Sequence, residues 1–163
     1  MTAPVVSPVV TTPERSPRRQ RPPVASRRFG YSLGIAINVL IIFFINEWPG
    51  WQQVPFLTDA TNDVLPLVNA SLVIGAVVNA VFLIGDPRWL KALGDAFTAA
   101  VSFVVIMVVL MVFPFDFSAY SFDWAMLVTV MLWIGLIGSA VAVVANLVTM
   151  VRELGGIETD PRP

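Results

Sequence analysis

The side chains that most often perform enzyme chemistry are missing from this sequence. Its 163 residues include neither histidine nor cysteine. An imidazole base, a thiolate nucleophile and the usual nitrogen and sulfur ligands of zinc are therefore excluded. A Ser-His-Asp triad is excluded for the same reason. We expect no catalytic set, no cofactor site and no metal site, and hence a protein that is not an enzyme.

Carboxylates are the remaining candidates for acid–base chemistry. Five of them lie in the two stretches between apolar runs that contain no lysine or arginine. They are Glu47, Asp59, Asp63, Asp116 and Asp123. Carboxylate oxygens bind calcium and magnesium, and carboxyl groups serve as general acids or bases. The spacing of these residues matches no known metal-binding loop. We expect solvated side chains, and a specific metal site stays open as the alternative.

Four amides lie within otherwise apolar runs: Asn38, Asn69, Asn79 and Asn146. An amide surrounded by hydrocarbon needs a hydrogen-bonding partner. We therefore expect these side chains to form polar contacts between helices. Asn79 and Asn146 lie at similar depths from the same side of the membrane, so the sequence allows a contact between them. The alternative is that the amides line a path for a substrate or an ion.

The elements that carry these amides are long, uncharged apolar runs. The chain is 56% apolar and only 13% charged, whereas a soluble domain has roughly 25% charged residues. Each run has the length of about 18 residues or more that a helix needs to cross about 30 Å of hydrocarbon. The sequence predicts an all-α membrane protein with a four-transmembrane-helix bundle over residues 29–152. The predicted spans are 29–46, 64–85, 96–115 and 124–151.

The two ends of the chain differ in composition from the predicted membrane domain. Residues 1–28 are rich in proline and arginine and poor in large apolar residues. Such a segment cannot bury a core, so we expect a disordered N-terminal tail. Residues 153–163 are expected to form a short C-terminal tail.

The distribution of charge predicts the orientation. All 10 lysine and arginine residues fall on one side of the predicted membrane, in both tails and in the segment between the second and third spans. Cytoplasmic loops carry an excess of these residues. We therefore expect a multi-pass protein of the cell (inner) membrane with both termini in the cytoplasm. Nucleic-acid binding is not expected, because the only basic run is a short arm beside the membrane.

Small residues spaced four apart mark candidate packing faces on three of the spans. Because lipid is as apolar as leucine, helices in membranes associate through small residues and polar contacts. We expect the first, second and fourth spans to pack most tightly and the third to face lipid. The candidate packing residues are Gly30, Gly34, Ser71, Gly75, Gly135 and Ser139.

Several short segments at the ends of the predicted spans carry a resemblance. They are Trp48-Pro49-Gly50-Trp51, Pro55-Phe56-Leu57-Thr58, Val64 to Leu72, Asp86-Pro87-Arg88-Trp89 and Phe113-Pro114-Phe115-Asp116-Phe117. Together they resemble a group of uncharacterised small four-span integral membrane proteins of high-GC Gram-positive bacteria. The resemblance covers about residues 27–155 and implies the same topology. It implies no activity, because the group has none assigned.

The sequence leaves three functional hypotheses. The first is an accessory or scaffold protein, whose partners are the lipid bilayer and either a larger membrane protein or further copies of itself. The second is a small oligomeric pore or carrier for a small solute, with Asn38, Asn79 and Asn146 along its path. The third is a lipid-modifying enzyme that uses the carboxylates between the spans. No charged residue lies inside a predicted span, which disfavours ion-coupled transport.

Overall fold

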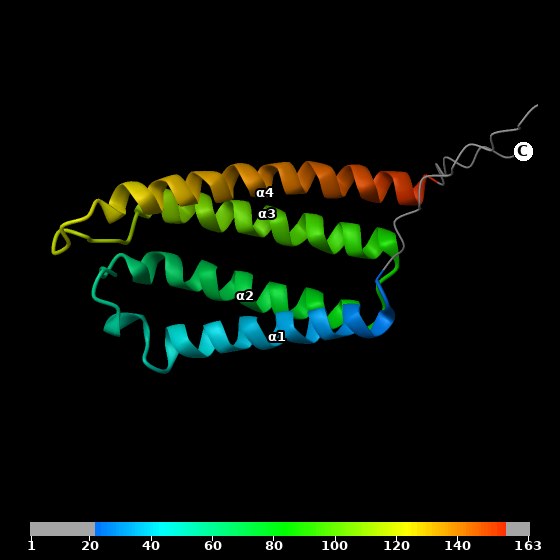
Figure 1. Ribbon diagram of the computed structural model, residues 1–163, viewed down its shortest axis with the longest axis horizontal. Helices are drawn as coiled ribbons and strands as arrows, with labels where there is room; N and C mark the ends of the chain where they lie inside the picture. Colours follow the sequence, from blue (N-terminus) through cyan, green and yellow to red (C-terminus); the bar gives the residue numbers. More distant parts are fainter. Residues whose placement is uncertain (1–21, 156–163) are drawn as a thin grey trace, which may run out of the picture.

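The computed structural model describes residues 22–155, which form four long helices that run alternately up and down (Figure 1). One short 3₁₀ helix, η1 (Trp51–Gln53), lies in the first connection. The α-helices are α1 (Val24–Asn46), α2 (Thr61–Ile84), α3 (Arg88–Val112) and α4 (Trp124–Leu154).

All four α-helices are long and apolar enough to cross a membrane. Most of their large apolar side chains are exposed, such as Phe29 at 70% and Ile134 at 63%. In water this exposure would be strongly unfavourable, at about 25 cal/mol for each Å² of apolar surface. Lipid removes that cost. The predicted four-helix membrane fold is confirmed over the described range, and the chain is a multi-pass membrane protein.

The helices lie in a row in the order of the sequence. Along the described part of the chain, α2 contacts α1 and α3, α4 contacts α3, and no other pair of α-helices makes contact. Figure 1 shows the two hairpins, α1–α2 and α3–α4, with α2 and α3 as the inner helices. Two long faces, on α1 and α4, are therefore left without a partner helix.

The expectation that the third span faces lipid while the first, second and fourth pack together is wrong. The structure packs α3 between α2 and α4, and α4 touches neither α1 nor α2 within residues 22–155. The reason lies in the first turns of α3, which precede the predicted span at residue 96. Ala92 and Ala96 are buried there. A Cβ on Gly94 would lie only 2.5 Å from Cζ of Phe82 on α2.

Local features set the helix ends, one of which agrees with the predicted spans and one of which does not. α4 begins at the predicted residue, because Asp123 caps it by accepting a hydrogen bond from the backbone N–H of Met126 at 2.9 Å. α3 ends at Val112, before the predicted 115. There Phe113 adopts a left-handed conformation (φ 43°) and Pro114 follows, and proline cannot continue the hydrogen-bonding pattern.

The two tails fall largely outside the described residues. α1 begins at Val24, so residues 24–28 of the expected N-terminal tail are helical. α4 continues to Leu154, two residues into the expected C-terminal tail. Residues 1–21 of the expected disordered tail and residues 156–163 lie outside the described range.

At one end of the row, the connection before α2 pairs with the connection after α3. The N–H of Thr58 donates to the carbonyl of Pro114 at 3.1 Å, and the N–H of Asp116 donates to the carbonyl of Phe56 at 2.9 Å. Leu57 and Phe115 form the bridge between them. We call this pairing of residues 56–58 with 114–116 the latch. It joins the two hairpins at the end of the molecule opposite to Arg27 and Asp86.

A substitution at Gly94 directly tests the packing of α3 against α2. Gly94→Leu should lower the melting temperature, because overpacking costs about 1–3 kcal/mol. That loss exceeds the gain of about 1 kcal/mol in helix propensity. Gly138→Leu is the matched control, since a Cβ there would meet nothing within 4 Å. Thermal unfolding in detergent compares the two, and equal melting temperatures would contradict the α2–α3 packing.

Candidate functional site

The contact between α1 and α2 is built from two glycines and two amides in a reciprocal arrangement. A Cβ on Gly34 would lie 3.0 Å from the carboxamide of Asn79, and a Cβ on Gly75 would lie 3.0 Å from Oδ1 of Asn38. Each glycine therefore provides the space that the amide of the opposite helix occupies. The same Gly-x-x-x-Asn pattern occurs on both helices, and the antiparallel direction brings each glycine to the other helix's asparagine.

Each of these amides also donates one hydrogen bond within its own helix. Nδ2 of Asn38 donates to the carbonyl of Gly34 at 2.7 Å, and Nδ2 of Asn79 donates to the carbonyl of Gly75 at 2.8 Å. Each of these bonds pairs one N–H of a carboxamide, which lowers the cost of placing the amide in hydrocarbon. The contact between the helices is then one of close packing, with the carboxamide fitted against a glycine backbone.

A second pair of amides joins the same helices nearer the latch. Nδ2 of Asn46 donates to Oδ1 of Asn69 at 2.9 Å, and Nδ2 of Asn69 donates to Oδ1 of Asn46 at 2.7 Å. The sequence analysis singled out Asn69 and missed Asn46. The signal was present, since Asn46 is the last residue of the predicted first span and Asn69 lies near the start of the second at the same membrane side.

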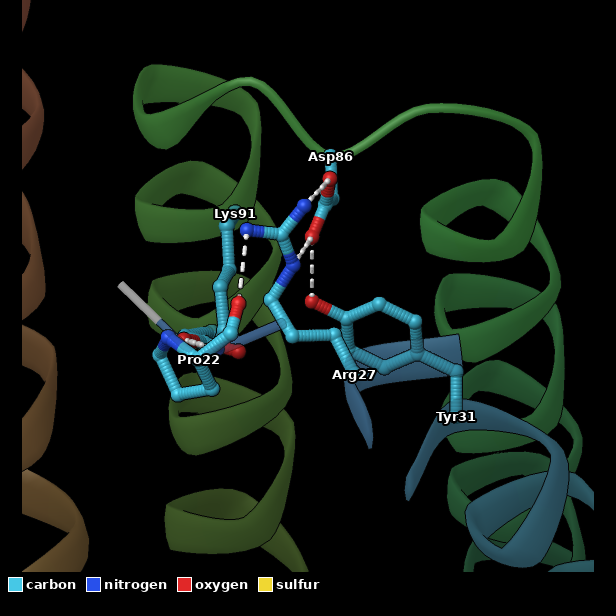
Figure 2. Close-up of polar contacts among 6 residues, drawn as sticks. Pro22, Arg27, Tyr31, Asp86 and Lys91 are labelled. Carbon is cyan, nitrogen blue, oxygen red and sulfur yellow. Dashed lines mark hydrogen bonds and ion pairs between the residues drawn. The ribbon is translucent and has the colours of Figure 1, made fainter. Parts of the chain in front are cut away.

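At the opposite end, a charged cluster ties the start of α1 to the residue just beyond α2. Nε of Arg27 lies 3.0 Å from Oδ2 of Asp86, and the hydroxyl of Tyr31 donates to the same oxygen at 2.8 Å. Figure 2 shows both side chains converging on Asp86. The side chains of Arg27 and Asp86 are only 17% and 16% exposed. The sequence analysis took both as loop and tail charges.

These contacts follow a single line along α1 and α2. From Arg27, the contact residues follow one another along α1 at intervals of four, three and four. Their partners start at Asp86, just beyond α2, and go back into α2 at the same intervals. Residues spaced three and four apart share one helix face. We call this line the α1–α2 seam. Its pairs are Arg27–Asp86, Tyr31–Phe82, Gly34–Asn79 and Asn38–Gly75.

The contact between Asn79 and Asn146 that the sequence allows is not formed. Asn79 packs on α1, and α2 and α4 do not meet anywhere in the described part of the chain. Asn146 is half-buried on α4. Two side chains can meet only at similar depths in the membrane, but similar depth does not determine which helices are neighbours.

The remaining candidate packing residues have separate environments. Ser139 is buried and donates to the carbonyl of Leu136 at 2.8 Å. A Cβ on Gly135 would lie 3.2 Å from Ile106 on α3, so this glycine lies at the α3–α4 contact. Ser71 donates to the carbonyl of Val68 at 2.7 Å. A Cβ on Gly30 would meet nothing within 4 Å.

The carboxylates around the latch are exposed and lie in the connections or, for Asp63, in the first turn of α2. Across residues 22–155, no group of three or more carboxylates lies close enough to hold a metal ion. A hydrogen bond from the backbone N–H of Ser118, at 2.9 Å, lowers the pKa of Asp116. A general acid at neutral pH needs the opposite shift.

Comparisons of the chain with protein-family models, with curated proteins and with solved structures found no match. The inference of function therefore rests on the structural features of the chain. They are the α1–α2 seam, the unpartnered faces of the outer helices and the latch.

A double-mutant cycle tests the reciprocal contact. Gly34→Ala should lower the melting temperature, because its Cβ would press on the carboxamide of Asn79. In an Asn79→Ala background the same change should cost nothing, giving a coupling of about 0.5–3 kcal/mol. Gly30→Ala, on the same helix but with open space around it, is the control. Equal costs of Gly34→Ala in both backgrounds would contradict the contact.

The charged cluster is tested with two neighbouring arginines. Arg27→Gln should destabilise the protein by about 1–3 kcal/mol, between the values typical of exposed and of buried ion pairs. Arg28→Gln removes the same charge from an exposed side chain and should leave the melting temperature unchanged. Thermal unfolding of both variants in one detergent separates the specific pair from the general loss of charge. Identical melting temperatures would show that the pair contributes no stability.

Proposed function

We propose that the protein is an accessory or scaffold subunit of the cell membrane that binds a larger membrane protein through α4. The observation that carries this proposal is the row of helices. Because α4 contacts α3 alone among the described helices, its face opposite α3 is left for another partner. With 31 residues, it is about 46 Å long at 1.5 Å per residue.

The outer face of α4 has a surface suited to another helix. We define this face by Ile134, Gly138, Val141, Ala145 and Val148, which are all exposed and recur every three or four residues. Small residues alternate with branched ones, and Ala145 and Val141 help to line a shallow hollow. Small residues let the backbone of a second helix approach closely.

The seam favours this proposal over the pore or carrier. Asn38 and Asn79 pack against glycines at a helix–helix contact and donate to their own helices. They are therefore engaged in packing and are poorly suited to line a path. A single row also encloses no channel, since α1 and α4 do not meet within residues 22–155. A pore would need further copies of the chain.

The distribution of charge supports the proposed orientation. The described basic residues lie at the end of the row that holds the Arg27–Asp86 pair: Arg27, Arg28, Arg88, Lys91 and Arg152. The latch end carries acidic residues and no lysine or arginine in the described range. By the excess of positive charge in cytoplasmic segments, we propose that both termini are cytoplasmic.

Photo-crosslinking in the native membrane tests the proposed docking helix. A photoreactive residue at Val141 should give one protein adduct of defined mass, whereas the same residue at Ile37, exposed on α1, should label lipid only. Gly138→Leu should abolish the adduct at Val141 without lowering the melting temperature, because it places bulk on the outer face alone.

The mass of the adduct decides between the hypotheses. An adduct with a different protein supports the accessory function. An adduct of twice the chain's mass would overturn it in favour of a homo-oligomer and make solute flux in proteoliposomes the next measurement. Labelling of lipid alone at Val141 would also overturn the proposal.

A further inference from the structure

A hollow of about 440 Å³ lies on the connection between α3 and α4, beside the latch. Figure 1 shows this connection, in yellow, projecting past the helix ends where α4 begins. We call this depression the aromatic hollow. Its lining combines aromatic rings with carboxylates and serine hydroxyls, so it offers polar and apolar surface together. The lining residues that carry the argument are Asp116, Phe117, Tyr120, Phe122, Asp123 and Trp124.

The rings of the hollow are largely uncovered but held in place. Tyr120 and Trp124 are each 42% exposed, and Phe122 is 58% exposed. Each packs edge-on against a neighbouring ring. The ring centroids of Tyr120 and Phe117 lie 6.3 Å apart, and those of Phe122 and Trp124 lie 5.0 Å apart. Phe117 also stacks at 5.4 Å on Phe56, which belongs to the latch. The rings are therefore ordered and available to a guest.

Two carboxylates give the hollow its charge. A hydrogen bond from the backbone N–H of Ser118 lowers the pKa of Asp116, and Asp123 accepts one from the backbone N–H of Met126. Each bond occupies one of the roughly four acceptor positions of a carboxylate, so both groups keep acceptors for a guest. Among residues 22–155, no lysine or arginine lies at this end of the row. The hollow is therefore suited to a cation.

An arginine side chain matches this lining better than other cations. Its planar guanidinium stacks on aromatic rings and forms paired hydrogen bonds with carboxylates, whereas a lysine ammonium is compact and strongly hydrated. A metal ion fits less well, because the described residues hold no group of three or more carboxylates that could bind one. Arginine is also enriched at protein interfaces and among the residues that dominate binding there.

The hollow continues the face of α4 that we propose as a docking surface. Trp124 precedes Gly138 by 14 residues, which is about 40° short of four full turns at 3.6 residues per turn. Met131, halfway between them, is 64% exposed. The same face of α4 therefore runs from Gly138 to the hollow, over about 21 Å of helix. A partner helix packed along α4 would bring the residues beyond its own end to the aromatic hollow.

We propose that the aromatic hollow receives an arginine of the membrane protein that α4 binds, with the guanidinium against the exposed rings and its charge paired with Asp116 and Asp123. This inference rests on the proposed function and names the chemistry of the partner at one end of the interface. In the proposed orientation the hollow lies on the side opposite the cytoplasm, where basic residues are scarce. An arginine there distinguishes the partner from other membrane proteins, because charge complementarity gives an interface its specificity.

Neutralising the hollow tests the pairing. Asp116→Asn combined with Asp123→Asn removes both charges, and asparagine keeps the cap of α4. The yield of the protein adduct at Val141, compared over a series of expression levels, should fall about 2–10-fold, the range expected for exposed ion pairs. Asp59→Asn combined with Asp63→Asn is the matched control and should leave the yield unchanged. It removes the same charge at the same end, from residues that do not line the hollow.

A second photoreactive residue identifies the guest directly. A photoreactive phenylalanine at Tyr120 should capture the same partner protein, and the captured peptide should contain an arginine. Changing that arginine to glutamate should lower the yield at Val141, and Asp116→Arg in this chain should restore it. High salt should lower the yield of the natural chain but not that of the variant with both asparagines, because an exposed pair is screened.

The outcomes separate this inference from the proposed function. A yield at Val141 that is unchanged in the variant with both asparagines would overturn the arginine contact and leave the accessory function standing. Labelling of lipid alone at Tyr120 would overturn the inference in favour of a lipid headgroup, and a captured peptide without arginine would also overturn it. The absence of any protein adduct at Val141 would overturn the proposed function, and this inference with it.

Discussion

The structure depends on one constraint: in hydrocarbon, apolar side chains gain little by meeting one another, because lipid solvates them equally well. Helices then stay together only where their backbones approach closely or where polar groups pair. The α1–α2 seam meets both conditions. Two glycines make room for two amides, and each amide donates a hydrogen bond to a carbonyl of its own helix. An ion pair and an amide pair fix the two ends of the same interface.

α2 is the helix on which the rest of the arrangement relies. One of its faces carries the seam to α1, and another receives the small residues at the start of α3 through Phe82 and Val78. Phe82 belongs to both contacts, since its ring also lies 5.4 Å from that of Tyr31. The latch repeats this junction at the other end with backbone hydrogen bonds. The two hairpins are thus joined at both ends of the inner pair of helices.

The sequence predicted the number, type and approximate extent of the helices, because length and hydropathy decide whether a segment can span a membrane. It predicted the start of α4 because the charged Asp123 ends the uncharged run, and the same residue caps the helix in the structure. It did not predict which helices are neighbours. The first turns of α3 were excluded from the span by their charges, although Lys91 pairs with Asp95 one turn later. Neighbour choice depends on complementary shape at a few positions, such as Gly94 against Phe82, and a linear sequence does not display that complementarity.

A row in which every helix touches only those adjacent in sequence has a consequence for biogenesis. All the helix–helix contacts of the described chain are between segments synthesised one after the other, and proteins dominated by such local contacts fold rapidly. The α1–α2 hairpin can therefore close with its seam complete before α3 has been made, and no later helix needs to be inserted between earlier ones. The nascent chain can assemble in the order of translation, with the latch forming only when the connection after α3 has emerged.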